Sequence, residues 1–399
     1  MNWEAILFYL DWVLFIISLM TILYLFIFSL AGMMGRKEQI GVSKLKRQIL
    51  VLFPCYKEDR IIESTVKSFL AQDYPTDKYD VVVISDHMEE LTNFKLAQYP
   101  IQLLTPNFEE SSKEKSMSYA IHNIPQKRYD IVVILDADNF VDTDFLQRIN
   151  NVYAAGSKAI QAHRVSKNTN TSTALLDAIS EEINNSIFRA GHVNIGFSSA
   201  LIGSGMALEY TWFKDHVDKL CTSGEDRELE VMLMSDRVYV DYLNDCYVYD
   251  EKVQKAKVFA VQRRRWMAAQ FNSLTMNFKK FFIALFQRNF DLADKIYQWM
   301  MLPRSILLVL VFFMGFLMPI VYSYVGIHWW MYAFKWWIAL FLFLLALAFA
   351  IPNYLVDERF NKALLQFPSL AFGMILNLFR LRGLRKRFLH TEHEYAGEK

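Results

Sequence analysis

The stretch "IVVILDADNF", residues 131–140, decides the fold class because it joins an apolar run directly to a pair of carboxylates. Its first five residues are apolar, and four of them are β-branched. A continuous apolar run of this length is typical of a strand that is buried on both faces of a parallel sheet. Similar runs come earlier in the chain, "ILVLFP" at 49–54 and "DVVVIS" at 80–85.

Helical patterns separate these runs, "RIIESTVKSFLAQ" at 60–72 and "SKEKSMSYAIHNI" at 112–124. Strand, helix and strand at this spacing predict βαβ units in a doubly wound α/β sheet. We therefore expect one α/β domain over residues 48–260. The net charge of +1 argues against a nucleic-acid-binding protein, which usually carries a basic excess. The three cysteines form no CxxC pair, so they indicate free thiols rather than a disulfide framework or a zinc site.

An apolar segment at 5–33 is long enough to span a membrane and lacks the basic flank of a signal peptide. Glu4 and Asp11 are its acidic flank. Basic residues follow it: Arg36, Lys37, Lys44, Lys46 and Arg47. Because basic loops stay in the cytoplasm, the N-terminus is predicted to lie outside and the chain that follows residue 35 to continue in the cytoplasm.

Two later apolar segments, 304–325 and 333–352, are also long enough to span. Tryptophans near the second predict an interfacial aromatic belt: Trp329, Trp330, Trp336 and Trp337. The segment 363–379 is weaker, and a span there would place the basic residues that follow it outside. We therefore expect an interfacial or re-entrant helix at 363–379, a cytoplasmic basic tail at 380–399, and interfacial helices over 261–303.

Carboxylates follow the predicted strands. In open α/β sheets, ligands bind beyond the carboxyl ends of the strands. Asp136 and Asp138, one residue apart, suit a hard divalent metal that also holds a diphosphate, whereas the alternative is a pair of solvated loop aspartates. Asp86 closes an earlier strand and could accept hydrogen bonds from a nucleobase or ribose, or cap a helix. Pro54 is expected to stop the pairing of the first strand, where a nucleotide-binding loop would begin.

Two later motifs carry further polar chemistry. "SGEDRELE" at 223–230 places Glu225 and Asp226 at a helix start, either as caps or as a general base. In "QRRRW" at 262–266, Gln262 and Trp266 share one helix face and Arg265 lies next to it. An amide, a guanidinium and an indole suit a sugar beside a phosphate, and a basic collar at lipid headgroups is the alternative.

Taken in order, four motifs resemble those of family 2 glycosyltransferases of the membrane-bound synthase type, the group of cellulose, chitin and hyaluronan synthases. They are Asp86, Asp136-Ala137-Asp138, Gly224-Glu225-Asp226 and Gln262-x-x-Arg265-Trp266. The resemblance covers residues 48–300. It implies the nucleotide-sugar transferase fold called GT-A for the α/β domain. The apolar segments add one N-terminal and two C-terminal transmembrane helices plus interfacial helices. The resemblance also implies a UDP-sugar donor and Mg²⁺ or Mn²⁺.

The resemblance assigns a role to each matching residue. Tyr56 and Glu58 would lie by the uridine, and Asp86 would contact the base. Lys113 would bind the nucleotide-sugar, and Asp136 would lie by its diphosphate. Asp138, with Asp136, would hold the metal. Asp226 would be the base, with Glu225 as the second candidate. Arg265 would bind the pyrophosphate, leaving Arg263 and Arg264 to headgroups or to the domain's own acids. The acceptor would contact Gln262, Trp266 and the loop Gly203-Ser204-Gly205.

The tail "RFLHTEHE" at 387–394 is similar to the gating loop of cellulose synthases, which would place Thr391 on the nucleotide. His390 and His393 replace the usual Val and Lys, and a zinc site at these two histidines is the rival reading. Ser118 likewise replaces the usual Asn after Lys113.

The implied reaction is inverting transfer of a hexosyl or N-acetylhexosaminyl group from a UDP-sugar to a glycan or lipid-linked acceptor. It would occur at the cytoplasmic face of the inner membrane, in contact with membrane lipid. The chain has fewer spans than polymer-exporting synthases, so a homodimer, or transfer of one or a few sugars to a lipid, fits as well. A membrane transporter or receptor with an α/β regulatory domain is the alternative from another class, and it predicts charged residues inside the spans.

Overall fold

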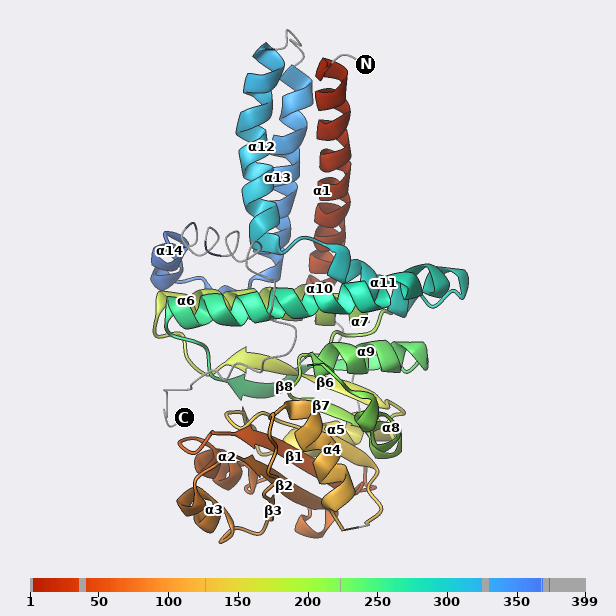
Figure 1. Ribbon diagram of the computed structural model, residues 1–399, viewed down its shortest axis with the longest axis vertical. Coiled ribbons are helices and arrows are strands. Elements are labelled where there is room, and N and C mark those ends of the chain that lie inside the picture. Colours follow the sequence, from red (N-terminus) through yellow and green to blue (C-terminus); the bar gives the residue numbers. More distant parts are fainter. Residues whose placement is uncertain are drawn as a thin grey trace.

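The computed structural model describes residues 3–35, 41–125, 127–222, 224–324, 330–366, 368 and 373. A sheet with its covering helices forms one end of the molecule (Figure 1). A layer of helices lies across the middle, and a bundle of long helices projects from that layer (Figure 1). The N-terminal helix belongs to this projecting bundle.

Every strand of the described chain belongs to one sheet. The strands are β1 (Ile49–Tyr56), β2 (Tyr79–Asp86), β3 (Gln102–Leu104), β4 (Ile131–Ile134), β5 (Phe140–Val141), β6 (Ala159–Ser166), β7 (Met206–Glu209) and β8 (Val240–Asp250). Their order across the sheet is β3-β2-β1-β4-β7-β6-β8-β5.

The helices divide among the sheet domain, the middle layer and the bundle. Those of the sheet domain are α2 (Ile62–Phe69), α3 (Glu90–Leu96), α4 (Lys113–Asn123), α5 (Phe145–Ala154), α8 (Tyr210–His216) and α9 (Glu225–Ser235). The middle layer contains α6 (Ser172–Asn184), a π-helical turn (Asn185–Gly191), α7 (His192–Asn194), α10 (Ala256–Phe286) and α11 (Phe290–Met300). The bundle contains α1 (Trp3–Met33), α12 (Arg304–Tyr324) and α13 (Trp330–Ala350), with α14 (Glu358–Leu364) beside its base.

The α/β sheet that the sequence predicts is present, but it is mixed rather than wholly parallel. β3, β2, β1 and β4 are parallel to one another, as the βαβ pattern predicts. β7 runs antiparallel to both β4 and β6. An apolar run shows that a strand is buried on both faces, but it does not encode the direction in which that strand runs.

Pro54 does not stop the pairing of the first strand, contrary to the expectation from the sequence. β1 stays in register with β2 through Tyr56, which pairs with Asp86. Along β1 the backbone groups alternate between neighbours, and the carbonyl of Leu52 accepts from Leu135 on the β4 side. The nitrogen of Pro54, which has no N–H to donate, therefore faces the β4 side. No hydrogen bond is lost there, because the pairing with β4 has already ended at Leu52.

Helices cover both faces of the sheet because their apolar residues recur at helical spacing. On α2, the buried residues Ile62, Val66 and Phe69 pack with α5 against one face. Helices α4, α8 and α9 pack against the other face. The two cores hold the carboxyl ends of β1, β2 and β4 at one edge of the sheet, and that edge faces the middle layer.

The bundle helices pack on one another through apolar side chains such as Leu25, Val311 and Phe343. Within the described residues, two helices are long and apolar enough to cross a membrane, Ala5–Met33 and Arg304–Tyr324. The third predicted span, 333–352, corresponds to α13, whose apolar part Phe334–Ala350 is shorter. Most of the predicted interfacial helix at 363–379 and all of the tail at 380–399 lie outside the described residues.

Asp11 and Trp336 have a different place from the one that the sequence suggested. Asp11 is buried inside the bundle, where it accepts from Tyr322 (2.5 Å) and from Nε1 of Trp336 (2.7 Å) and forms an ion pair with Lys335. Asp11 is thus not a flanking residue, and the fully buried Trp336 is not part of an interfacial belt. A buried carboxylate must be paired or hydrogen-bonded. The indole of Trp336 and the ammonium of Lys335 therefore lie inside the bundle, where they meet Asp11.

Candidate active site

The ends of β1 and β2 form the first wall of the site. Asp86 is 1% exposed, and its Oδ1 lies 2.6 Å from Nδ1 of His87. Its Oδ2 is buried without a hydrogen-bond partner among the described residues. Lys57 and His87 follow the two strands with φ of 57° and 55°, so the chain turns away sharply at both strand ends. A buried carboxylate oxygen is thereby left facing the site without a donor.

The residues after β4 form the second wall. The backbone N–H of Asp136 donates to Oγ of Ser204 at 2.9 Å and to Oδ1 of Asn139 at 3.1 Å. Asp138 is 5% exposed and accepts from the amide of Asn139 (3.1 Å) and from the backbone N–H of Glu251 (3.2 Å). These contacts hold the Asp-Ala-Asp turn firmly against the sheet edge.

The loop Gly203-Ser204-Gly205 lies under this turn. Gly203 and Gly205 have φ of 82° and 65°, and a Cβ on Gly205 would come within 2.8 Å of Val248. Glycine is therefore required at that position. Ser204 is fully buried and contacts Asp136 and Asn139, so it supports the turn.

Lys113, at the start of α4, joins three parts of the site. Its ammonium forms an ion pair with Asp136, donates to the carbonyl of Gly203 (2.6 Å) and lies 3.6 Å from Oε1 of Glu225. Burial lowers the pKa of Lys113, but the carboxylates of Asp136 and Glu225 outweigh burial and the net shift is upward. Lys113 is therefore a fixed cation between the strand ends and α9.

Glu225 and Asp226 form the first turn of α9, as the sequence predicts. Burial raises the pKa of Glu225 to about 7; Lys113 opposes this shift and Asp226 adds to it. Oδ1 of Asp226 accepts from the backbone N–H of Arg227 at 2.8 Å. A carboxyl that titrates near neutrality, beside a second carboxylate, is suited to proton transfer.

Helix α10 closes the site from the side of the middle layer. Gln262, Arg265 and Trp266 line the same cavity as the strand ends. Oε1 of Gln262 is buried without a partner among the described residues. Arg263 donates to Asp177 on α6 at 2.5 Å and lies over the ring of Trp266, 4.6 Å from its centroid. Arg263 thus meets one of the domain's own acids, in agreement with the sequence-based expectation.

One continuous cavity of about 1010 Å³ unites these walls. Most of the predicted site residues line it: Tyr56, Glu58, Asp86, Lys113, Asp136, Asp138, Gly203, Glu225, Asp226, Gln262, Arg265 and Trp266. Its volume is at the upper end of the range for ligand pockets, so it can hold more than one small molecule. It also reaches α6 and the adjoining parts of α1, α12 and α13.

The profile of the family described as "Glycosyltransferase like family 2" matches residues 47–269, more than half of the chain. The chain belongs to glycosyltransferase family 2. This membership decides between the enzyme and the transporter or receptor alternatives, in favour of the enzyme. The GT-A fold and the glycosyltransferase activity inferred from the four motifs are thereby confirmed.

Individual relatives agree with the family. The poly-β-1,6-N-acetyl-D-glucosamine synthase of Staphylococcus aureus is 30% identical over 114 residues, which are 28% of this chain and 26% of that synthase. The match thus spans about a quarter of the curated relative. The mannosyltransferase PcManGT of Pyrobaculum calidifontis, solved with GDP-Man and Mn²⁺, has a TM-score of 0.53 at 15% identity. It covers 86% of this glycosyltransferase and 97% of its own chain, and it shows the fold.

The residues of this glycosyltransferase fit a divalent metal by their chemistry. The described residues contain no group of three or more His, Cys, Asp or Glu placed to hold a metal by themselves. Asp136 and Asp138 supply two hard oxygen donors at the cavity wall. Mg²⁺ is commonly held by one or two carboxylates together with substrate phosphates and waters, which is the donor set available here.

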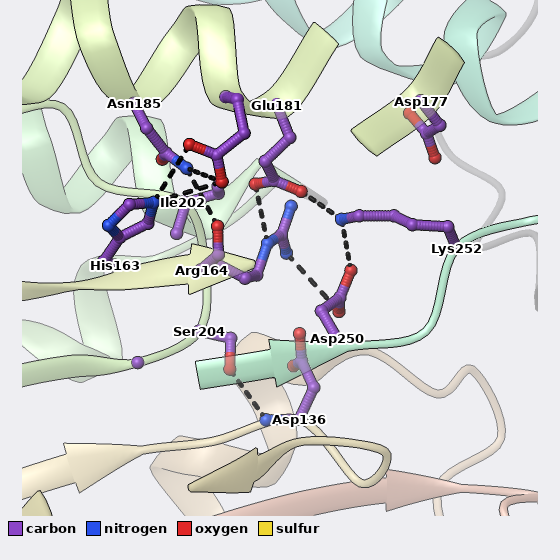
Figure 2. A network of polar contacts seen from close by, with 12 residues as sticks. Asp136, His163, Arg164, Asp177, Glu181, Asn185, Ile202, Ser204, Asp250 and Lys252 are labelled. Carbon is purple, nitrogen blue, oxygen red and sulfur yellow. Dashed lines mark hydrogen bonds and ion pairs between the residues drawn. The ribbon is translucent and has the colours of Figure 1, made fainter. Parts of the chain in front are cut away.

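A buried ionic network at the cavity wall was missed by the sequence analysis (Figure 2). Arg164 donates to Glu181 at 2.9 Å and lies 3.9 Å from Asp250. Lys252 pairs with Glu181 and lies 2.7 Å from Asp250, so two cations and two carboxylates close a ring. Asp250 also accepts from Asn139 at 3.3 Å. The network ties α6 to the Asp-Ala-Asp turn.

A signal for this network exists in the sequence. Arg164 lies near the end of β6, and Asp250 and Lys252 lie at and just after the end of β8. Polar residues at the ends of strands also indicated the other residues of the site. Among the predicted site residues, Thr391 lies outside the described residues, together with the gating-loop-like segment 387–394. Ser204 and Gly205 lie behind the cavity wall.

Proposed function

We propose that this glycosyltransferase moves a sugar from a UDP-sugar to a glycan or lipid-linked acceptor, with inversion, at the cytoplasmic face of the membrane. The observation that carries this proposal is the continuity of one cavity. It joins the carboxylates at the strand ends, the first turn of α9 and the Gln262–Trp266 face of α10. Donor, base and acceptor groups therefore share one space.

The donor lies along the strand ends in this proposal. The unpartnered Oδ2 of Asp86 accepts a hydrogen bond from the nucleobase, beside Tyr56 and Glu58. The diphosphate lies between Asp136 and Arg265, where the guanidinium binds it as a fork. Mg²⁺ or Mn²⁺ at Asp138 and Asp136, when bound, would offset the charge of the diphosphate.

Proton transfer falls to the first turn of α9. Asp226 takes the proton of the acceptor hydroxyl, which then attacks the anomeric carbon from the face opposite the leaving group. Glu225 is the second candidate, because burial brings its pKa to about 7. Lys113 stays protonated between Glu225 and Asp136 and orients both carboxylates.

The acceptor lies against α10 in this proposal. The indole of Trp266 stacks on a sugar ring, and the buried, unpartnered Oε1 of Gln262 accepts from its hydroxyl groups. Leu308 and Leu347 of the bundle line the same cavity, so an acceptor can extend toward the apolar helices. This direction favours an acceptor at the membrane over a soluble one.

The membrane position rests on the bundle and on α10. Helices α1 and α12 have the length and composition of spans. Helix α10 exposes large apolar side chains beside the bundle, among them Phe271, Phe278 and Phe282. Such a face suits the membrane surface. The basic residues after α1 support a topology with the sheet domain in the cytoplasm and the start of α1 outside.

A second candidate function is transfer of one or a few sugars onto a lipid. The apolar end of the cavity favours it, because that end can hold a lipid chain next to the acceptor face. The two functions share donor, base and metal, and they differ in the size of the product.

The test uses membranes that contain the protein and a panel of labelled UDP-sugars, with GDP-mannose as the comparison donor. We expect one UDP-sugar to be incorporated, with the anomeric configuration of the product opposite to that of the donor. Product size separates a polymer from a short glycolipid. Incorporation from GDP-mannose alone, or retention of configuration, would overturn the proposal.

A further inference from the structure

Three arginines gather where the cavity meets the bundle. Arg189 of the π-helical turn, Arg263 of α10 and Arg304 of α12 all line it. Arg263 is paired with Asp177. Arg304 donates instead to neutral groups of α6, the carbonyl of Ser180 (3.1 Å) and the amide oxygen of Asn184 (2.8 Å).

The charges around Arg304 are not balanced locally. No ion pair joins Arg304 to a carboxylate among the described residues, and Arg263 and Arg189, which act on Arg304 electrostatically, are both cations. Arg189 is 4% exposed and donates to the neutral amide of Asn185 at 2.8 Å. Burial lowers the pKa of Arg189, although Glu181 acts to raise it. Glu181 is itself already paired with Arg164 and Lys252.

Each of the three guanidinium groups also has an unmet donor. Nη1 of Arg304, Nε of Arg189 and Nε of Arg263 are buried without a hydrogen-bond partner among the described residues. A buried cationic donor without a partner is costly, so a cluster of them needs a compensating anion. Phosphate matches the planar fork of a guanidinium better than most anions.

The wall beside the cluster is apolar. Side chains of all three bundle helices line this end of the cavity, namely Leu25, Leu308, Leu344 and Leu347, and Ile351 lies just after α13. An inorganic anion bound to the arginines would make no contact with this apolar wall. A molecule with a phosphate at one end and an apolar chain at the other matches both parts.

We propose that Arg189, Arg263 and Arg304 bind the phosphate headgroup of an amphiphile whose apolar chain lies against α1, α12 and α13. This inference rests on the proposed function, because it assigns the acceptor side of that site. The guanidinium of Arg263 lies over the ring of Trp266, so a group attached to the phosphate reaches the side chain that is proposed to hold the acceptor. The acceptor is therefore a lipid that carries a phosphate.

The experiment measures binding of ³²P-labelled dodecyl phosphate to the purified full chain in an uncharged detergent. A second arm uses ³²P-labelled inorganic phosphate, and dodecanol serves as an uncharged competitor. We expect dodecyl phosphate to bind, dodecanol to compete weakly, and inorganic phosphate to bind much more weakly. Arg304→Gln should weaken dodecyl phosphate binding about tenfold or more, the size expected for loss of a charge-assisted hydrogen bond.

Arg264→Gln is the matched control. Arg264 is on the same helix as Arg263, but it does not line the cavity. Its replacement should leave dodecyl phosphate binding within about twofold, since no charge facing the ligand is lost. Ala348→Phe is a second variant, at an exposed position of the apolar wall, and it should weaken dodecyl phosphate binding without affecting inorganic phosphate. It decides the outcome if Arg304→Gln does not fold.

Equal binding of dodecyl phosphate by the wild type and by Arg304→Gln or Ala348→Phe would overturn the inference. Inorganic phosphate that binds as tightly as dodecyl phosphate would overturn it too, because the site would then hold free phosphate rather than a lipid. UDP binding is measured on the same wild-type preparation. Protein that binds UDP but not dodecyl phosphate refutes the lipid site alone, whereas arginine-dependent lipid binding without UDP binding refutes the proposed donor.

Discussion

Replacing Asp226 by Asn separates a general base from a helix cap in the first turn of α9. Oδ1 of Asp226 accepts a hydrogen bond from the backbone N–H of Arg227 at 2.8 Å. The N-cap of α9 is Gly224, so Asp226 supports the helix only from within its first turn. The amide oxygen of Asn can accept the same bond, and loss of the charge near the helix N-terminus costs little. The free energy of unfolding should therefore change by less than about 1 kcal/mol. Only the capacity to take a proton is lost.

The expected loss of rate is much larger. General-base catalysis contributes about 10²–10⁴ in rate, which corresponds to about 3–5 kcal/mol of transition-state stabilisation. Glu225→Gln is the matched variant in the neighbouring position. If Asp226 is the base, Asp226→Asn should lose at least about a hundredfold in kcat, and Glu225→Gln should lose less.

The stability of the two variants should also differ with pH. Burial raises the pKa of Glu225 from 4.5 to about 7. Folding therefore favours the protonated carboxyl, so the wild type should lose stability as the pH rises from about 4.5 to about 7. Glu225→Gln removes this loss and should unfold at a higher temperature than the wild type at pH 8. The difference is at most about 3 kcal/mol, because each pKa unit corresponds to about 1.36 kcal/mol.

The assay pairs single-turnover transfer from the labelled donor with UDP binding and thermal unfolding of each variant. Asp226→Asn should fold, bind UDP as the wild type does, and barely transfer. Transfer within about threefold of the wild type, with binding intact, would assign Asp226 to capping. If Glu225→Gln loses more kcat than Asp226→Asn, and if its rate no longer changes with pH near pH 7, Glu225 is the base.

Three further predictions test the metal, the topology and the bundle. Asp138→Asn should abolish metal-dependent transfer, because one remaining carboxylate holds a divalent ion poorly; activity near that of the wild type, or a wild type that chelator leaves active, would contradict the metal role. Cys221 is the exposed native cysteine, and a membrane-impermeant maleimide should label it only after cells are opened, whereas Tyr324→Cys in a Cys221→Ser background should be labelled in intact cells; the reverse pattern would invert the topology. Lys335→Met should destabilise the bundle by about 3–5 kcal/mol in thermal unfolding, because Asp11 loses its buried partner, and adding Asp11→Asn should recover part of that loss; equal losses in the single and double variants would show that the pair is not coupled.

The sequence alone determined those features that depend on local pattern. Continuous apolar runs located β1, β2 and β4, because a strand buried on both faces needs no polar residue over its length. The carboxylates after those runs, Asp86 and Asp136, had to lie at one edge, because parallel strands end on the same side of a sheet. The first turn of α9 and the shared face of Gln262 and Trp266 followed from helical periodicity in the same way.

Tertiary structure decided which charged groups meet. Lys113 is 23 residues from Asp136, and Arg263 is 86 residues from Asp177. Lys335 pairs with Asp11 across the bundle from 324 residues away. No local sequence pattern links such partners. Two charges pair only where the packed helices and sheet bury them next to each other. Once a charge is buried there, the cost of leaving it without a partner selects the opposite charge or the hydrogen-bond donor that the fold brings within reach.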